Sequence, residues 1–311
     1  MEERSEKEAV LAVKILVVRY AAMGDSIMTA WTVSAIKNRF PEAEIVWAIQ
    51  TRCAPVIAPE LARTAIFERD KRSGSAASLK AQFEFYRRLR EEKFDVGFDF
   101  QGHVKTAICL KMARPKLKFA LASADGFTKV INRVSDVDAR FVHTVEREGA
   151  FASLYEPLTL PRLPYMPDYS HLAPSLDKPL ITIQTGAGAK NKTYPIEQWQ
   201  EVADHFSAKG FHVTALGGPK DPHLERVDCR VGKMSLEESL AWVAASRIHL
   251  AADTGTGHAA AAYGVPTLSI FGPTDDQKFR PWGESARLLK RGDMAGDVPA
   301  AEVIEEAEKI L

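Results

Sequence analysis

Two successive alternations of short apolar runs with helical stretches most restrict how this chain can fold. Residues 14–19 and 44–49 are near-continuous apolar runs, as expected for parallel strands buried on both faces, and a helix is predicted between them from 26 to 39. The alternation begins again with strands at 180–184 and 211–216. Alternation of this kind predicts parallel sheets that are covered by helices.

A proline-rich segment separates the two runs of alternation. Residues 156–179 contain six prolines, which cannot donate to a sheet and disfavour helix at the preceding residue, so an extended linker is predicted. The length of 311 residues also favours two domains. We therefore predict an α/β fold of two Rossmann-like, doubly wound domains facing across a cleft, at 1–155 (with 1–13 as an extension) and 180–311. The final helix, 300–311, is expected to pack back on the first domain.

Composition and cysteine usage exclude several classes of protein. With 46% hydrophobic and 26% charged residues, the composition is that of a globular protein, neither disordered nor fibrous. The longest uncharged run, 254–274, is interrupted by glycines and a proline, and the N-terminal extension lacks a signal peptide's apolar core, so a cytoplasmic protein is expected. Cys53, Cys109 and Cys229 lie far apart, which predicts neither disulfides nor a thiolate metal site. We expect no metal, no cofactor and no nucleic-acid partner.

Charge is distributed unevenly although the net charge is zero. Residues 1–155 carry 25 Lys/Arg and 20 Asp/Glu, and residues 156–311 carry an equal excess of acid. The segment 105–133 holds seven basic residues and one acid, Asp125. Such a segment is either a solvated face or a site that attracts an anionic substrate or lipid headgroup, and charge alone leaves both open.

A junction between a strand and a helix at 251–262 predicts a phosphate site. A buried run ends at Asp253, a turn follows at Thr254 and Gly255, and a helix of small residues begins. Unpaired N–H groups and the helix dipole favour an anion there, although N-capping explains the same residues. His258 is either a packed helix histidine or a catalytic group.

Two glycine loops follow other predicted strands. The loop 185–193 approaches the phosphate-binding pattern GxxxxGK[ST] with Gly186 and Lys192, but Asn191 occupies the position of the second glycine. It can still hold a diphosphate, with the lysine as charge partner, or be a surface loop. In the second loop, Asp221 can bind ribose hydroxyls or simply belong to a turn.

In the first half, Asp25 follows the strand 14–19 and stands at the start of a helix. Aspartate is common there as a cap. The loop also faces the predicted cleft, because ligands gather at the carboxyl ends of parallel strands. A carboxylate in the cleft can act as general base on an alcohol, so both roles remain open.

Together these segments resemble glycosyltransferase family 9, which contains the ADP-heptose:lipopolysaccharide heptosyltransferases. The resemblance extends from about residue 14 to 285, in matching order and spacing, and rests on Ile15-Leu-Val-Val-Arg19 with Met23-Gly-Asp25, Lys192-Thr-Tyr-Pro195, Gly217-Gly-Pro219, Asp253-Thr-Gly255 with His258, and Phe271-Gly-Pro-Thr-Asp275. Residues 94–106 and 233–237 are similar to the heptosyltransferase I branch in particular.

The resemblance implies a GT-B fold with an acceptor-binding first domain and a donor-binding second domain, and inversion at the anomeric carbon without a metal. Asp25 would be the base that takes the proton from the acceptor hydroxyl. Lys192 would bind the donor phosphates, Met234 would lie against adenine, and Asp221 would lie near the ribose. The donor-binding residues implied in this way are Thr185, Gly186, Lys192, Asp221, Met234, Asp253, Thr254 and Gly255.

The resemblance also suggests an acceptor. In the heptosyltransferase I branch this is the anionic Kdo-lipid A core at the inner membrane, which gives the basic segment a purpose. Gln101, Lys105, Lys129 and Arg133 are the predicted acceptor contacts. The predicted function is transfer of heptose from ADP-heptose to Kdo-lipid A in lipopolysaccharide biosynthesis, by an enzyme held peripherally on the cytoplasmic face of the bacterial inner membrane.

The sequence departs from the family pattern at Tyr194, where tryptophan is usual, and at 186–189, where Gly-Ala-Gly-Ala replaces hydroxyl-bearing residues. Backbone N–H groups are expected to bind the diphosphate in their place. The alternatives are another nucleotide sugar, a non-catalytic binder, and a nicotinamide-dependent oxidoreductase. The retained Asp25 argues against the binder, and neither glycine loop supplies the GxGxxG that the oxidoreductase needs.

Overall fold

The first half of the chain forms a parallel sheet of five strands flanked by helices. The computed structural model describes residues 13–68, 76–121, 137 and 140–311. The strand order is β3-β2-β1-β4-β5, and every neighbouring pair is parallel. The elements are β1 (Lys14–Val18), α1 (Met23–Arg39), β2 (Glu44–Ile49), the 3₁₀ helix η1 (Thr51–Val56), β3 (Arg63–Ile66), α2 (Ala76–Glu91), β4 (Val96–Asp99), α3 (Val104–Ala113), β5 (Leu117–Ala120) and α5 (Thr144–Ala152).

The second half forms a parallel sheet of six strands in the order β11-β10-β9-β6-β7-β8. Its strands are β6 (Leu180–Gln184), β7 (His212–Leu216), β8 (Asp228–Cys229), β9 (Ile248–Ala252), β10 (Thr267–Phe271) and β11 (Ala286–Lys290). Its helices are α6 (Ile196–Ala208), α7 (Leu236–Ala245), α8 (Gly255–Ala262), α9 (Asp276–Phe279) and α10 (Ala300–Ile310), with the short 3₁₀ helices η2 (Ser170–Leu172), η3 (Lys190–Lys192) and η4 (Ala295–Asp297).

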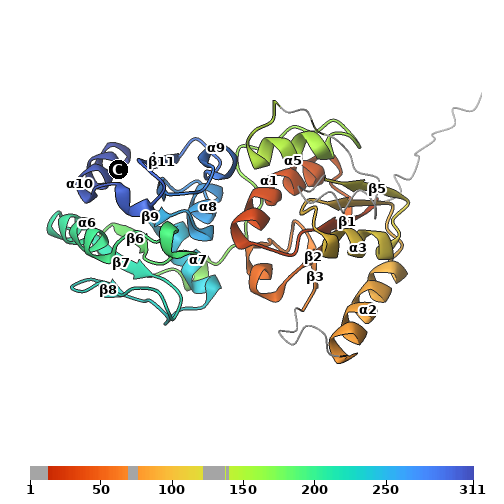
Figure 1. Cartoon of the computed structure of the whole chain (residues 1–311), viewed down its shortest axis with the longest axis horizontal. Helices are drawn as coiled ribbons and strands as arrows, with labels where there is room; N and C mark the ends of the chain where they lie inside the picture. The colour runs from red at the N-terminus through yellow and green to blue at the C-terminus, as the bar shows by residue number, and fades with distance from the viewer. Residues whose placement is uncertain (1–12, 69–75, 122–136, 138–139) are drawn as a thin grey trace, which may run out of the picture.

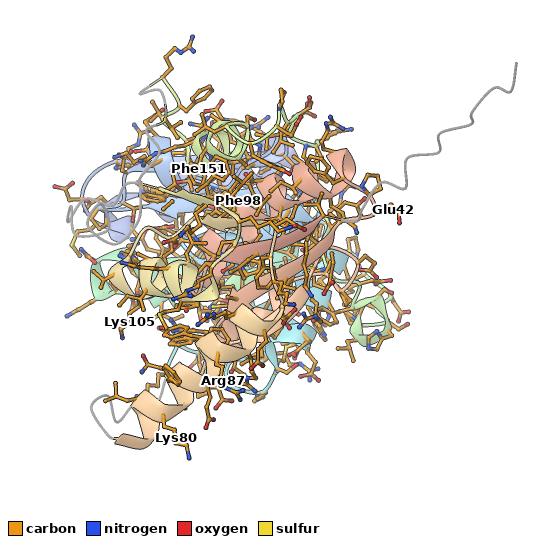
Figure 2. All side chains as sticks on the ribbon, turned by 90° about the vertical axis from the view of Figure 1, so that its right-hand side faces the viewer. Glu42, Lys80, Arg87, Phe98, Lys105 and Phe151 are labelled. Atoms are coloured by element: carbon orange, nitrogen blue, oxygen red, sulfur yellow. The ribbon has the colours of Figure 1, made fainter. Side chains whose placement is uncertain are left out.

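The apolar strands are buried as their composition predicts. Every residue of β9 and β10 is buried, as are four of the five in β1. Phe98 of β4 and Phe151 of α5 pack edge to face, with ring centroids 6.1 Å apart, and fix α5 on the first sheet (Figure 2). Strand order reverses beside β1 in the first sheet and beside β6 in the second, and such reversals create a crevice at the carboxyl ends of the strands.

The two sheets lie side by side, with α1 of the first domain packed on α8 of the second (Figure 1). The segment between the sheets is largely extended and touches both. Its Tyr165 N–H donates to Ser34 Oγ on α1 at 2.9 Å, and its Pro167 carbonyl accepts from the Tyr263 hydroxyl at 2.9 Å. This segment therefore ties the domains together beside the α1–α8 contact.

One helix starts earlier than predicted, and another packs on a different domain. The helix α1 begins at Met23 rather than near residue 26, so Asp25 lies inside its first turn.

The last helix, α10, packs on α6 and β10 of its own domain, far from the first sheet in Figure 1. Its Val303 and Ala307 share a core with Trp199. The expectation that it would return to the first domain was wrong, because its apolar face covers the second sheet. None of the described helices is long and apolar enough to cross a membrane.

Candidate active site

A cavity of about 350 Å³ lies between the domains. The first domain lines it with the start of α1, including Asp25, and the second domain with the loops after β6, β9 and β10. The lining residues are Ala22, Gly24, Asp25, Met28, Lys192, Asp253, Thr254, Gly255, His258, Thr274 and Phe279. Residues predicted from two distant parts of the sequence, Asp25 and the set Lys192, Asp253, Thr254 and Gly255, therefore face the same space. We call this space the reaction cavity.

A second cavity of about 600 Å³ opens at the carboxyl ends of β6, β7 and β9. It shares Lys192, Asp253, Thr254 and Gly255 with the reaction cavity. Its other lining residues are Met23, Gln184, Gly186, Ala187, Gly188, Ala189, Gly217, Gly218, Asp221, Met234, Ser235, Leu236, Ser239 and Thr256. The glycine and alanine loop exposes backbone, and Met234 and Leu236 supply apolar surface. We call this space the nucleotide cavity.

The two cavities meet at an ion pair. Lys192 Nζ lies 2.7 Å from Asp253 Oδ2, and the Thr274 hydroxyl donates to the same oxygen at 2.6 Å. The Lys192 side chain is 32% exposed and that of Asp253 is 9% exposed. Lys192 can therefore turn part of its charge toward an anion in either cavity while Asp253 holds its position.

Asp221 joins the two glycine loops of the nucleotide cavity. Its carboxylate accepts from the Gly218 N–H at 2.7 Å and from Gln184 Nε2 at 3.3 Å. A Cβ atom on residue 186 would lie 1.9 Å from the Asp221 carboxyl carbon, so any side chain there would displace this carboxylate. Asp221 thus stabilises the turn by its bond to the Gly218 N–H, and it also faces the cavity, where ribose hydroxyls can reach it.

Thr185 is predicted to bind the donor, but its side chain turns away from the nucleotide cavity. The hydroxyl donates to the Pro222 carbonyl at 2.7 Å, and the residue is only 1% exposed. Its role in the structure is to hold the loop that carries Asp221.

A buried chain of hydrogen bonds supports Thr254 from beneath. The Thr254 and Thr256 hydroxyl oxygens are 3.1 Å apart, and Thr256 Oγ1 lies 3.0 Å from His249 Nε2. His249 Nδ1 lies 2.9 Å from the Thr182 hydroxyl in β6. Burial lowers the pKa of His249 to about 3, so the ring is neutral. This chain connects the second sheet to the cavity wall.

Asp25 lies in the first turn of α1, and its side chain is 35% exposed toward the reaction cavity. Its Oδ2 accepts from the Ala22 N–H at 3.2 Å, and its Oδ1 is 3.6 Å from Arg19 Nη2. The N-cap is Ala22 rather than Asp25, and the Asp25 carboxylate reaches back to the N-cap N–H as the acidic residue of a capping box does. The other side of the carboxylate remains turned to the cavity, so the same residue can cap the helix and accept a proton.

His258 is buried and lines the reaction cavity. Burial lowers the pKa of its imidazole, against the opposing effect of Asp253 and Asp25. A Cβ atom on residue 24 would lie 2.8 Å from His258 Cδ2, so the ring packs directly on Gly24 across the domain boundary. Packing is therefore its first role in this structure.

Of the predicted acceptor residues, Gln101 and Lys105 are described by the structure, and neither lines either cavity. Gln101 Oε1 accepts from the Tyr20 N–H at 2.8 Å and so ties the loop after β4 to the loop after β1. Lys105 is exposed on α3, on the outer side of the first domain (Figure 2). Lys129 and Arg133 lie outside the described residues.

The family model for glycosyltransferase family 9 (heptosyltransferase) matches residues 82–296, most of the chain. The chain belongs to glycosyltransferase family 9. It is 27% identical over 297 residues to lipopolysaccharide heptosyltransferase 1 of Pseudomonas aeruginosa, covering 88% of this chain and 82% of that protein. It is also 21% identical over 333 residues to lipopolysaccharide heptosyltransferase 3 of Escherichia coli, covering 93% and 96%.

Solved structures agree with this chain in fold. The structure described as E. coli heptosyltransferase WaaC with ADP matches with a TM-score of 0.82 at 20% identity, over 96% of this chain and 100% of that one. The fold of this family 9 protein is therefore GT-B, with two Rossmann-like domains, as the resemblance implied. Because it belongs to this family, the protein is a glycosyltransferase, and the alternative of a nicotinamide-dependent oxidoreductase is excluded.

Sequence reasoning missed three residues of the site. Thr274 bonds to Asp253, His249 supports Thr254, and Arg19 lies beside Asp25. A histidine inside an apolar strand was a usable signal for His249, because a buried imidazole needs hydrogen-bond partners. Thr274 lies in the segment Phe271-Gly-Pro-Thr-Asp275, but the local sequence does not indicate that its partner is Asp253.

Proposed function

We propose that this glycosyltransferase transfers a heptose from ADP-heptose to the Kdo-lipid A inner core, with inversion and without a metal. The observation that carries this proposal is that Asp25 and the Lys192–Asp253 pair line one cavity from opposite domains. An activated hydroxyl from one side and a departing diphosphate from the other can meet there. Relatives named as lipopolysaccharide heptosyltransferases 1 and 3 support the choice of sugar and acceptor class.

The nucleotide cavity suits an adenosine diphosphate. Met234 offers apolar contact for the adenine and Asp221 faces the cavity as a partner for ribose hydroxyls. The loop 186–189 offers backbone N–H groups to the diphosphate. A structure described as WaaC with ADP-2-deoxy-2-fluoro heptose, at 20% identity and a TM-score of 0.80, supports this donor.

The chemical step is a direct displacement. The acceptor oxygen attacks the anomeric carbon while Asp25 takes the hydroxyl proton, and the bond from that carbon to the ADP oxygen breaks. Lys192 and the helix start at Thr254 stabilise the negative charge that develops on ADP. Attack opposite the departing ADP inverts the anomeric centre. Closure of the domains excludes water, which would hydrolyse the donor.

The acceptor is anionic, so we place it against the basic outer side of the first domain, with Lys105 as one contact. The enzyme would then sit peripherally on the cytoplasmic face of the bacterial inner membrane.

The deciding experiment incubates the protein with ADP-heptose and other nucleotide sugars, each with Kdo-lipid A, and identifies the product by mass spectrometry. We expect a glycosylated product only in the incubation that contains ADP-heptose, and this product should carry a heptose. Asp25→Asn should reduce turnover by about 10²-fold or more while leaving ADP affinity unchanged. Transfer of a different sugar would refute the choice of donor. Tight ADP binding without turnover on any acceptor would favour the non-catalytic binder.

A further inference from the structure

Arg19 stands between two carboxylates, of which only one faces the reaction cavity. The residue follows β1 and is 6% exposed. Its Nη2 lies 3.6 Å from Asp25 Oδ1, and its Nη1 lies 3.4 Å from Glu148 Oε1. Its Nη1 also donates to the Phe100 carbonyl at the end of β4. The guanidinium is thus held by groups from three different elements.

Glu148 reaches Arg19 from the buried face of α5. That face otherwise presents small or apolar residues, including Val145, Phe151 and Ala152, and it packs on α1. The Glu148 side chain is 2% exposed. A carboxylate at such a position is costly unless it is paired, and an apolar residue of similar size would serve packing better. Its presence therefore calls for a role beyond packing.

We propose that Glu148 is a positioning residue for the transfer reaction, which holds the Arg19 guanidinium and offsets its charge so that Asp25 stays free to accept the acceptor proton. The inference rests on the proposed role of Asp25 as the base. Glu148 acts through Arg19 and touches neither cavity.

The physical consequence is a dependence of Asp25 on the charge of Glu148. While Glu148 is ionised, its negative charge offsets the positive charge of Arg19. Once Glu148 is protonated, the charge of Arg19 acts on Asp25 without this offset, which makes Asp25 a weaker base. Burial raises the pKa of Glu148 to about 7, against the opposing effect of Arg19. Activity should therefore rise through neutral pH as Glu148 ionises.

Other charged groups surround this pair. On α5, Arg147 adds a positive charge that favours the ionised form of Glu148, and Asp25 on α1 adds a negative one. At the end of β4, burial raises the pKa of Asp99 to about 6, and Arg19 opposes this.

The second domain contributes charged and titratable groups across the reaction cavity. These are His258, Lys192 and Asp253. Because these groups are also present, a change in the pH profile tests the proposal only when a substitution of Glu148 itself produces it.

The test is Glu148→Gln, which removes the charge and keeps the shape. The profile of kcat/KM is measured from about pH 5.5 to about pH 9. In the wild type we expect a rise near pH 7; in Glu148→Gln we expect that rise to disappear and the rate above neutral pH to fall about tenfold. ADP affinity, measured by calorimetry, should not change. Glu148→Asp, which keeps the charge, should restore a rise in the profile.

The matched control is Glu146→Gln, on the same helix but outside the Arg19 cluster, which should leave the profile unchanged. A Glu148→Gln profile that superimposes on the wild type would overturn the proposal, as would an equal loss at every pH together with a lowered melting temperature. Failure of the base assignment is separable from this, because Asp25→Asn would then remain active whatever Glu148 does.

Discussion

Met23 of α1 lies against Gly255 of α8 so closely that a Cβ atom on residue 255 would be 2.1 Å from Met23 Cε. Beside this contact, Gly24 lies against the ring of His258. Glycines on both sides thus allow the first turn of α1 to approach the first turn of α8. This approach brings Asp25 to the same cavity as Lys192 and Asp253, so the domain contact and the reaction cavity are one structural feature.

Gly255→Ala should weaken ADP binding. The added methyl group displaces Met23, which also lines the nucleotide cavity, and we expect a loss of about 1 kcal/mol, or about fivefold in Kd by calorimetry. Adding Met23→Ala should recover most of the affinity, because the shorter side chain leaves room for the methyl group. Additive losses in the double variant would show that Met23 is not the cause.

Lys192→Ala should weaken ADP binding by about 2 kcal/mol, or about thirtyfold, because the diphosphate loses its cationic partner. Lys190→Ala is the matched control, since Lys190 is exposed and lines neither cavity. Calorimetry at low and high salt measures both variants, and the difference between them should shrink as salt rises. Equal effects of the two substitutions would point to general charge rather than to a contact made by Lys192.

Thr256→Val should destabilise the second domain by about 1–3 kcal/mol, because it leaves His249 Nε2 buried without its partner. Urea unfolding measures this loss. Thr193→Val removes a hydroxyl bond that is exposed to solvent and should cost less than about 0.5 kcal/mol. Donor affinity should fall in Thr256→Val as well, since Thr254 loses its support. A variant as stable as the wild type would mean that water or a shifted side chain satisfies His249.

Glu148→Gln should change how stability depends on pH. The folded-state pKa of Glu148, about 7, exceeds the ordinary value of 4.5. Between these two pH values the folded state therefore binds a proton that the unfolded state has lost. Stability from this group is present at low pH and is lost as pH rises through that window. The glutamine variant should therefore gain about 2–3 kcal/mol relative to the wild type between about pH 5 and about pH 8 in urea unfolding. A constant difference across this range would contradict the raised pKa.

Much of the fold was predictable because its signals are local. Runs such as 14–19 and 180–184 report burial on both faces, which parallel strands require, and the structure confirms both strands. The short strand β8 and the edge strand β11 gave no such signal, because their residues are mostly half-buried. The helix α10 was identified in the sequence but placed on the wrong domain, because an apolar helix face does not show which surface it packs against.

The candidate site, like the fold, was predictable only in part. Asp25 follows a strand of the first sheet, and Lys192 and Asp253 follow strands of the second, and parallel strands bring their exits to one edge of each sheet. Thr185 stood at such an exit too, yet its hydroxyl turns to the Pro222 carbonyl. The direction of a side chain depends on bonds that a pattern along the chain does not record.

The sequence by itself determined two parallel sheets, the family, and the residue types that stand at the ends of the strands. The sheets and the residues at the strand ends follow from local burial patterns and from the turn chemistry of each loop, and the family follows from the motifs that resemble it. The tertiary structure decided that Gly255 meets Met23, that His249 supports Thr254, and that Glu148 shares Arg19 with Asp25. These contacts join elements far apart in the chain, and packing between helices and sheets, rather than any periodicity within one of them, brings the side chains together.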